Sequence, residues 1–288
     1  MLCSSTMLVV NKIAITTFPA PSALLFCQLS VAAIAIYSSS AAELITLQRI
    51  SDNVLKSYVF VSLTFLAALY SNVKILQYAN VETFIVFRSS TPVFISILDY
   101  LFLGRELPSR SSCISLVCLF LGALAYAYTD SQYEVRAYSW VLCWYVVFCF
   151  DQIYIKRVVD ECKLSSWSSS FYTNAFASVP SLLCAMHTSE LDIVRGALTD
   201  SKAISLVLLS CVVGVMMSVS SFNLRSLVSA TYFTVVGTLC KIISVLINYA
   251  MWDKHASPTG LLALVFCICS ATFYRQAPVR QANYNIKR

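Results

Sequence analysis

Charged residues are scarce in this sequence, and their scarcity excludes an ordinary soluble domain. Aspartate, glutamate, lysine and arginine make up 12% of the 288 residues, whereas a soluble globular domain carries about 25%. Apolar residues reach 58%, and the mean hydropathy is positive. The composition therefore predicts an integral membrane protein whose main solvent and partner is membrane lipid.

Glycine and histidine are also rare, with six and two residues, and the motifs of common enzymes are missing. The sequence has no H-E-x-x-H, no G-x-S-x-G, no paired carboxylates and no clustered glycines that could cradle a phosphate. The twelve cysteines form no C-x-x-C pair and stand mostly singly in apolar runs, so neither disulfides nor zinc are expected. The net charge of +6 is scattered between apolar runs and does not indicate nucleic acid as a partner. We expect a protein that is not an enzyme and has no metal and no cofactor.

Apolar runs of bilayer length alternate with short polar breaks along the chain. They predict ten transmembrane helices, near residues 1–17, 22–41, 57–76, 82–103, 112–129, 138–156, 167–187, 203–223, 228–250 and 257–275. The first run is short for a crossing, so it is tilted or re-entrant, or the sequence lacks some N-terminal residues. No cleavable signal peptide is expected, because the N-terminus has neither a basic leader nor a small-residue cleavage site.

The basic residues of the breaks indicate the orientation of the chain. With ten crossings and both termini in the cytosol, the lysines and arginines of the breaks, Arg225 among them, concentrate on the cytosolic side. Residues 276–288 are expected to form a basic cytosolic tail, either a solvated anchor or an export signal. The breaks are too short for a second domain, so residues 1–288 form one transmembrane domain. The oligomeric state is left open between a monomer and a homodimer.

Two segments separated by about half the chain share one pattern of elements. Segments 82–129 and 230–275 each combine a polar-faced helix, a charged hinge with a proline, and a helix rich in glycine, alanine and cysteine. The chain therefore divides into halves of about residues 1–130 and 138–275. Because each half has an odd number of helices, the halves would lie inverted across the membrane, as in secondary transporters. The predicted fold is an all-α membrane protein with two inverted five-helix repeats.

The predicted span 228–250 has a lysine, Lys241, near its middle. A lysine at the centre of a membrane helix costs roughly 2.5–3.5 kcal/mol, so we expect it to face a polar cavity. Steps of three or four residues place a set of polar residues and one glycine on the face of Lys241: Thr231, Thr234, Gly237, Thr238, Ser244 and Asn248. Our hypothesis is that the lysine receives an anionic solute. The alternative is a lysine that a buried carboxylate neutralises for structural reasons.

Lys12 and Arg88 are the other cations within predicted spans. With Lys241 they outnumber the acids that lie deep, and a cavity with excess positive charge attracts anions. Phosphate or pyrophosphate suits it, because arginine binds two oxygens at once and lysine acts as a point charge. Asp99 and Asp151 are expected to be structural instead, each as the partner of another helix's cation near the cytosolic end. Pro92, one turn after Arg88, is a candidate hinge.

Amide and hydroxyl groups in two other spans could recognise a base. The run Phe171-Tyr172-Thr173-Asn174 offers an amide with both a donor and an acceptor. The next span contributes Ser218, Ser220, Ser221 and Asn223. Serines also serve helix packing in membranes, so they are weaker indicators of a binding site.

These motifs resemble those of the Golgi nucleotide-sugar transporters, within the drug/metabolite transporter superfamily, and among them the GDP-sugar branch. Gly237-Thr238-Leu239-Cys240-Lys241 stands where that branch has G-A-L-N-K, Phe171-Tyr172-Thr173-Asn174 stands at F-Y-N-N, and Asn11-Lys12 stands at N-K. Residues 83–89 and 252–256 look like the plant-type GDP-fucose and related GDP-sugar transporters, and the resemblance covers nearly the whole chain. Thr173 departs from the motif by removing one amide from base recognition, and Thr238 and Cys240 depart from it beside the sugar.

The resemblance implies ten helices around a central cavity in the Golgi membrane. It implies exchange of a cytosolic GDP-sugar for lumenal GMP by alternating access, with GDP-fucose as first choice and GDP-mannose as second. The implied binding residues are Asn174 and Tyr172 near the guanine, Ser218 and Ser221 in the same pocket, Gly237 and Thr238 beside the ribose or sugar, and Lys241 near the phosphates. Arg88, Lys12 and Asn11 complete the expected set. The alternatives are an antiporter of UDP-sugars or of triose phosphate and phosphate from the same superfamily, and a membrane-embedded enzyme or receptor, which the missing motifs disfavour.

Overall fold

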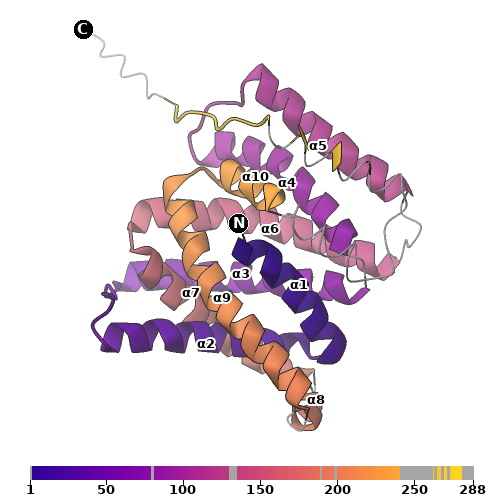
Figure 1. Cartoon of the computed structure of the whole chain (residues 1–288). Helices are drawn as coiled ribbons and strands as arrows, with labels where there is room; N and C mark the ends of the chain where they lie inside the picture. Colours follow the sequence, from indigo (N-terminus) through magenta and orange to yellow (C-terminus); the bar gives the residue numbers. More distant parts are fainter. Residues whose placement is uncertain are drawn as a thin grey trace.

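The computed structural model describes residues 2–78, 81–129, 135–188, 190–197, 200–240 and 273–280, together with 262, 265, 266, 269 and 270. Within these residues the chain is helical and contains no strand beyond one isolated bridge. The helices are α1 (Leu2–Thr17), α2 (Pro21–Ala41), α3 (Asp52–Tyr78), α4 (Val81–Phe102), α5 (Arg110–Thr129), α6 (Val135–Cys162), α7 (Ser166–His187), α8 (Glu190–Ala197), α9 (Ser201–Leu227) and α10 (Ala230–Leu239) (Figure 1).

The predicted spans from residues 22–41 to 203–223 each correspond to one helix, but two differences matter for the site. The break after His187 contains the short α8, whose Glu190 accepts a hydrogen bond from the backbone N–H of Ala23 in the first turn of α2 at 2.9 Å. The helices α6 and α9 also run beyond their apolar stretches, to Cys162 and Leu227. The span 257–275 lies almost entirely outside the described residues. With eight residues, α8 is too short to cross a membrane.

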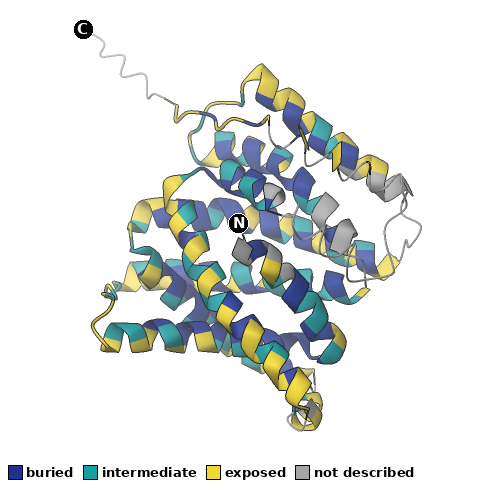
Figure 2. Cartoon of the chain, in the orientation of Figure 1, coloured by how far each residue is buried: buried dark blue, intermediate teal, exposed yellow. Residues whose placement is uncertain are grey.

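Four of the described helices, α2, α3, α6 and α9, are long and apolar enough to cross a membrane. Their outward faces carry large apolar side chains, such as Ile34 with 64% and Leu142 with 68% exposure. Figure 2 shows the buried residues gathered where helices face one another, with exposed residues along the outer faces. Apolar side chains of this kind suit contact with lipid. The backbone polar groups are also compatible with lipid, because they form hydrogen bonds within each helix. The chain is therefore a multi-pass membrane protein.

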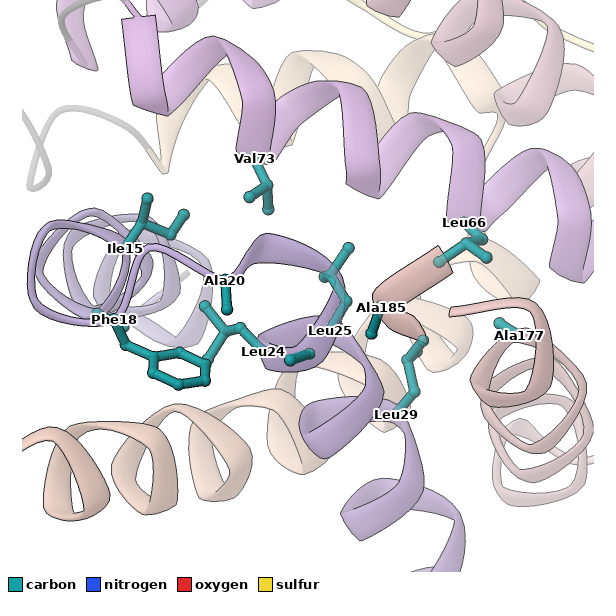
Figure 3. Packing of buried hydrophobic residues seen from close by; sticks show 12 residues of the cluster. Ile15, Phe18, Ala20, Leu24, Leu25, Leu29, Leu66, Val73, Ala177 and Ala185 are labelled. Atoms are coloured by element: carbon teal, nitrogen blue, oxygen red, sulfur yellow. The ribbon is translucent and has the colours of Figure 1, made fainter. Parts of the chain in front are cut away.

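Helix packing brings distant parts of the sequence together. Helix α3 packs against α6 and α7, α2 packs against α7 and α9, and α4 packs against α5, α6 and α10. Helix α9 runs obliquely across α2 and α3 in the view of Figure 1. One apolar cluster joins α1, α2, α3 and α7, and Figure 3 labels these members of it: Ile15, Phe18, Ala20, Leu24, Leu25, Leu29, Leu66, Val73, Ala177 and Ala185.

Pro92 lies within α4, and the helix continues through it. A proline has no N–H, so the carbonyl of Arg88, four residues earlier, loses its usual helical partner. The hydroxyl of Thr91 donates to this carbonyl at 2.8 Å. A hydroxyl that satisfies a freed carbonyl is a common way for a membrane helix to accommodate proline. The backbone of Arg88 is thus held by its own helix.

The first part of the basic tail packs against the connection between α4 and α5. Val279 forms an antiparallel bridge with Arg105, and the N–H of Arg280 donates to the carbonyl of Gly104 at 2.9 Å. The guanidinium of Arg280 lies 4.3 Å from the ring centroid of Tyr100. Residues up to 280 therefore contact the transmembrane bundle, whereas a solvated anchor was one of the two predictions for this tail. Residues 281–288 lie outside the described part.

Candidate substrate-binding cavity

A cavity of about 170 Å³ lies between the helices, and α1, α2, α3, α4, α6, α7, α9 and α10 all contribute to its wall. Ligand pockets have volumes of roughly 300–1,000 Å³, so the helices must separate before a nucleotide-sized molecule can enter. The wall is mainly apolar and aromatic. Its polar and charged members are Ser4, Asn11, Gln28, Asn72, Arg88, Asp151, Gln152, Asn174, Ser218, Ser221 and Arg225.

Arg88 projects into the cavity from α4, as the sequence predicted for a cation in this span. Its guanidinium carbon lies 4.8 Å from the ring centroid of Phe148 and 5.9 Å from that of Phe84. Its Nε is buried and has no hydrogen-bond partner among the described residues. A Cβ placed on Gly237 of α10 would lie 3.5 Å from its Nη2, so the guanidinium rests against the bare backbone of α10. This arrangement leaves the cation without an anionic partner in the described structure.

Arg225 is a second arginine in the same wall, and the sequence analysis had placed it in a cytosolic break. That placement is wrong, because α9 continues to Leu227 and turns Arg225 inward with 8% exposure. Its guanidinium carbon lies 4.2 Å from the ring centroid of Phe233 on α10. The guanidinium makes no hydrogen bond to any residue in the described ranges, and it repels Arg88 electrostatically. The cavity therefore holds two arginines that are stacked on aromatic rings.

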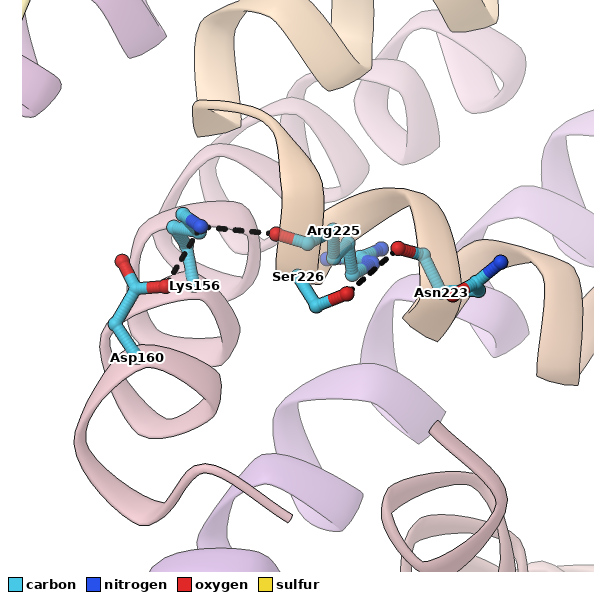
Figure 4. A network of polar contacts seen from close by, with 5 residues as sticks. All are labelled: Lys156, Asp160, Asn223, Arg225 and Ser226. Carbon is cyan, nitrogen blue, oxygen red and sulfur yellow. Dashed lines mark hydrogen bonds and ion pairs between the residues drawn. The ribbon is translucent and has the colours of Figure 1, made fainter. Parts of the chain in front are cut away.

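The position of Arg225 is fixed from outside the cavity. Lys156 of α6 donates to the carbonyl of Arg225 at 2.9 Å and pairs with Asp160 at 2.7 Å (Figure 4). In the same turn of α9, the hydroxyl of Ser226 donates to the carbonyl of Asn223 at 2.7 Å. The ammonium of Lys156 thus satisfies a carbonyl near the C-terminus of α9, where carbonyls lack helical partners. These contacts tie the end of α9 to α6.

Asp151 is an acid in the same wall, and it was predicted to partner a cation of another helix near the cytosolic end. The cation that attracts it is Arg225 of α9, although the two form no ion pair within the described residues. Lys156, five residues further along α6, pairs with Asp160. Asp151 is 1% exposed and accepts hydrogen bonds from Thr64 at 3.0 Å and from Gln152 at 3.1 Å. It lines the cavity and attracts Arg225 electrostatically.

Asn174, Ser218 and Ser221 also lie in the cavity wall, on α7 and α9. The amide nitrogen of Asn174 donates to Ser218 at 2.7 Å and to the backbone carbonyl of Ser170 at 2.8 Å. Ser170 and Ser218 also share a hydrogen bond of 2.6 Å. These contacts occupy the amide donors, so the amide oxygen is the group that Asn174 can offer to a ligand. The sequence analysis had expected both a donor and an acceptor there.

Asn11 lines the cavity from α1, where its amide oxygen accepts a hydrogen bond from Gln28 at 2.9 Å. Its neighbour Lys12 is outside the wall and donates to the carbonyl of Leu76 at 2.5 Å. Tyr172 is also outside the wall. Its hydroxyl donates to the carbonyl of Gln48 at 2.8 Å, in the connection between α2 and α3.

Helix α10 places part of the predicted polar face against α4 rather than in the cavity. The backbone N–H of Thr231 donates to Asp99 at 2.9 Å, and its hydroxyl donates to the same carboxylate. Asp99 therefore caps the N-terminus of α10, and the prediction that it partners a cation is corrected. Gly237 lies on α10 beside Arg88. Lys241, Ser244, Asn248 and the side chain of Thr238 lie outside the described residues.

The residues that the sequence analysis missed do leave a signal in the sequence. Ser218, Ser221 and Arg225 follow one another at steps of three and four, so they share one face of α9. Phe148 and Asp151 are likewise three residues apart on α6. Extending the polar face of span 203–223 past its apolar run would have included Arg225, whereas Asp151 already lies within span 138–156.

Comparison with known proteins identifies relatives along almost the whole chain. A model of the Triose-phosphate Transporter family matches residues 1–275. The GDP-fucose transporter 1 of Arabidopsis thaliana is 38% identical over 96% of this chain and 83% of its own length. The GDP-mannose transporter GONST3 of the same plant is 36% identical over 98% of this chain and 77% of its own length. The UDP-sugar transporter UST74c of Drosophila melanogaster is 24% identical over 83% of this chain and 65% of its own length.

A solved crystal structure resembles this fold with a TM-score of 0.63, over 94% of this chain and 95% of that chain. The two sequences are 13% identical, so the likeness concerns the fold alone. The fold is thus one that has been observed by crystallography.

Proposed function

Because the chain belongs to the Triose-phosphate Transporter family, whose members are transporters and not enzymes, we propose that it is a nucleotide-sugar antiporter. It imports a GDP-sugar, with GDP-fucose favoured over GDP-mannose, into the Golgi lumen in exchange for GMP. The proposed substrate follows the names of the two relatives that are more than one third identical. The Golgi location and the cytosolic termini are parts of the same proposal.

The observation that carries this proposal is the pair of arginines that line one membrane cavity, the half-buried Arg88 and the buried Arg225. Neither guanidinium has a hydrogen-bond partner within the described ranges, although a buried cation without a partner is costly. A diphosphate offers several anionic oxygens, and each guanidinium can bind two of them. Lys241 follows Gly237 by four residues in the sequence, and we propose it as a third contact to the phosphates.

The base is proposed to lie at the other side of the cavity, near Asn174, Ser218 and Ser221. Guanine presents N–H groups along one edge, and the free amide oxygen of Asn174 can accept from them. The hydroxyl of Ser221 can donate to or accept from the base. The ribose or sugar would then lie between the two groups, beside Gly237 and Thr238. Asn11 contributes from α1, whereas Lys12 and Tyr172 support the wall from outside it.

Transport is proposed to occur by alternating access of ten membrane helices in two inverted repeats of five. The small volume of the cavity supports this mechanism, because the substrate can enter only when the helices move apart. A cavity whose cations outnumber its one acid, Asp151, is unfavourable when it is empty, so the protein would change sides only with a nucleotide bound. This property would couple the import of GDP-sugar to the export of GMP.

Transport by purified protein in liposomes tests the proposal. Uptake of labelled GDP-fucose should occur when the liposomes contain GMP and should fall to background when they contain no nucleotide. A panel of internal GMP, UMP, AMP and triose phosphate identifies the counter-substrate. Uptake with UMP or triose phosphate but not with GMP would assign the protein to one of the two alternative substrate classes, and uptake that ignores the internal nucleotide would contradict the exchange.

A further inference from the structure

Asp151 is a charged group in the cavity for which the proposed transport cycle has no role so far. It lies on the face of α6 that also carries Phe148, and it is 1% exposed. Two neutral side chains, Thr64 and Gln152, hold its two oxygens. Because Thr64 and Gln152 are neutral, their hydrogen bonds do not neutralise the negative charge of the carboxylate, which can still attract a cation.

The cation that attracts Asp151 is Arg225 on α9. The two charges attract one another, yet the ion pairs found among the described residues lie elsewhere, so carboxylate and guanidinium are not in direct contact. The guanidinium rests on the ring of Phe233 and lines the same cavity. Both groups line the cavity that is the proposed substrate site. An anion that enters it meets one group that attracts it and one that repels it.

Gln152 gives independent evidence that a ligand could bind at this part of the wall. Its amide nitrogen donates to Asp151, and its amide oxygen is buried without a partner among the described residues. A buried oxygen without a donor costs free energy comparable to a lost hydrogen bond. The side chain is 1% exposed and lines the cavity. A ligand that contributes an N–H or O–H group, together with an anion for Arg225, would satisfy both.

We infer that Asp151 is the internal anion of the cavity: it neutralises Arg225 while no nucleotide is bound and yields it to a phosphate group when one binds. The inference rests on the proposed function, because it needs an anionic substrate in this cavity. It assigns Arg225 as a second phosphate-binding cation next to Arg88. It assigns Asp151 as a group that repels the bound phosphate. The weaker binding lets the nucleotide leave on either side of the membrane.

The test measures binding of GMP to purified protein in which Asp151 is changed. We expect Asp151→Asn to bind GMP about tenfold more tightly, because the phosphate no longer competes with a fixed negative charge. Exchange should slow down at the same time, because release becomes harder. We expect Arg225→Gln to bind GMP at least about tenfold more weakly, because it loses the cation and leaves Asp151 unopposed.

The double variant distinguishes an interaction between the two charges from two separate effects. Arg225→Gln with Asp151→Asn should bind GMP more tightly than Arg225→Gln alone, since the repelling carboxylate is gone. Glu190→Gln is the matched control, because Glu190 is an equally buried acid that meets a backbone N–H outside the cavity. It should leave the affinity for GMP unchanged. Arg225→Lys retains the charge and serves as the second variant if Arg225→Gln does not fold.

Unchanged or weaker binding of GMP by Asp151→Asn, in protein as stable as the wild type, would overturn the inference and leave Asp151 as a structural acid. If Asp151→Asn does not fold alone, the double variant is compared with Arg225→Gln, and binding of GMP by the double variant that is no tighter overturns the inference. A wild-type protein that binds UMP and not GMP would contradict the proposed substrate only. In that case the same variants are compared with UMP, and the inference is decided by the same tenfold change.

Discussion

Asp99 and Asp151 are two buried aspartates on apolar helices, and they differ in what meets their carboxylates. Asp99, with 3% exposure, receives the backbone N–H and the hydroxyl of Thr231 at the start of α10. Asp151, with 1% exposure, receives only side chains and faces a cavity with two arginines. A carboxylate that caps a helix serves the fold, because its charge stabilises unpaired N–H groups. A carboxylate held by side chains beside a cavity remains able to respond to a ligand.

The largest effect is expected on the cavity side of this comparison, at Arg88. Arg88→Gln removes a cation that no described residue pairs with, so the fold loses little and the substrate loses an anchor. We expect the exchange of GDP-fucose for GMP to fall about hundredfold, which corresponds to roughly 3 kcal/mol for a charged hydrogen-bonded contact. Transport assays and unfolding in detergent should be measured on the same preparation.

Arg280→Gln is a control for this variant, because Arg280 stacks on Tyr100 outside the cavity wall. Its exchange rate should remain within about twofold of the wild type, since it removes a surface contact with little effect on stability. If Arg88→Gln were much less stable but each folded molecule exchanged substrate as fast as the wild type, Arg88 would serve the fold, as Asp99 does, and not the substrate.

The next effect concerns the structural side, at Asp99. Asp99→Ala leaves the backbone N–H and the hydroxyl of Thr231 without their acceptor. We expect the free energy of unfolding to fall by about 2 kcal/mol, because the variant loses a buried helix cap that a charged carboxylate provides. Unfolding by denaturant in mixed micelles measures it. The affinity of the folded fraction for GMP should change far less than in Asp151→Asn.

Asp160→Ala is the exposed counterpart of this change, because the side chain of Asp160 is 51% exposed. Its pair with Lys156 is partly solvated and should contribute less than about 1 kcal/mol. If Asp99→Ala bound GMP differently from the wild type without losing stability, Asp99 would act on the ligand rather than on the fold, contrary to the role assigned to it.

The sequence predicts the helices well and the charged part of the site poorly, and α9 explains why. Hydropathy finds the apolar run at residues 203–223, but the helix continues to Leu227 because backbone hydrogen bonding and packing do not end where hydrophobicity ends. The additional turn carries Arg225 into the cavity. The periodicity of Ser218 and Ser221 predicts the face, whereas the neighbour that this face meets depends on packing between distant helices.

The predicted residues of the site divide in the same way. Asn11, Arg88, Asn174, Ser218 and Ser221 line the cavity, so the polar faces of single helices were informative. Lys12 follows the lining residue Asn11 and Tyr172 stands two residues before the lining residue Asn174, yet both donate to carbonyl groups of other segments. Neighbouring positions on a helix point about 100° apart, and a short motif does not say which of its members faces the ligand.

A smaller effect is expected at the contact that holds Arg225 in place. Lys156→Met removes the bond to the carbonyl of Arg225 while it preserves most of the buried side-chain volume. We expect a loss of about 1.5 kcal/mol in the free energy of unfolding, because a charged hydrogen bond is lost in a buried place. The affinity for GMP should fall by a few fold, since Arg225 becomes less well positioned. Unfolding and binding of GMP are measured together.

Arg157→Met is the matched control for Lys156→Met. Arg157 is the next residue on α6 and forms the same type of i,i+4 pair, with Glu161, but both side chains are about 60% exposed. Its stability should stay within about 0.5 kcal/mol of the wild type, because exposed ion pairs contribute little. Equal effects of the two changes would mean that the link between α6 and α9 does not position Arg225.

The smallest effect is expected at Thr91, which supports the backbone of Arg88 rather than its charge. Thr91→Val keeps the shape of the side chain and removes the hydroxyl that donates to the carbonyl freed by Pro92. We expect a loss of about 0.5–1 kcal/mol, the usual net contribution of a neutral hydrogen bond. The double variant Thr91→Val with Pro92→Ala should recover this loss, because alanine restores the N–H that pairs with the carbonyl. Equilibrium unfolding of the two variants decides the question, and a double variant less stable than Thr91→Val would mean that Pro92 holds α4 in a shape on which Arg88 and the cavity depend.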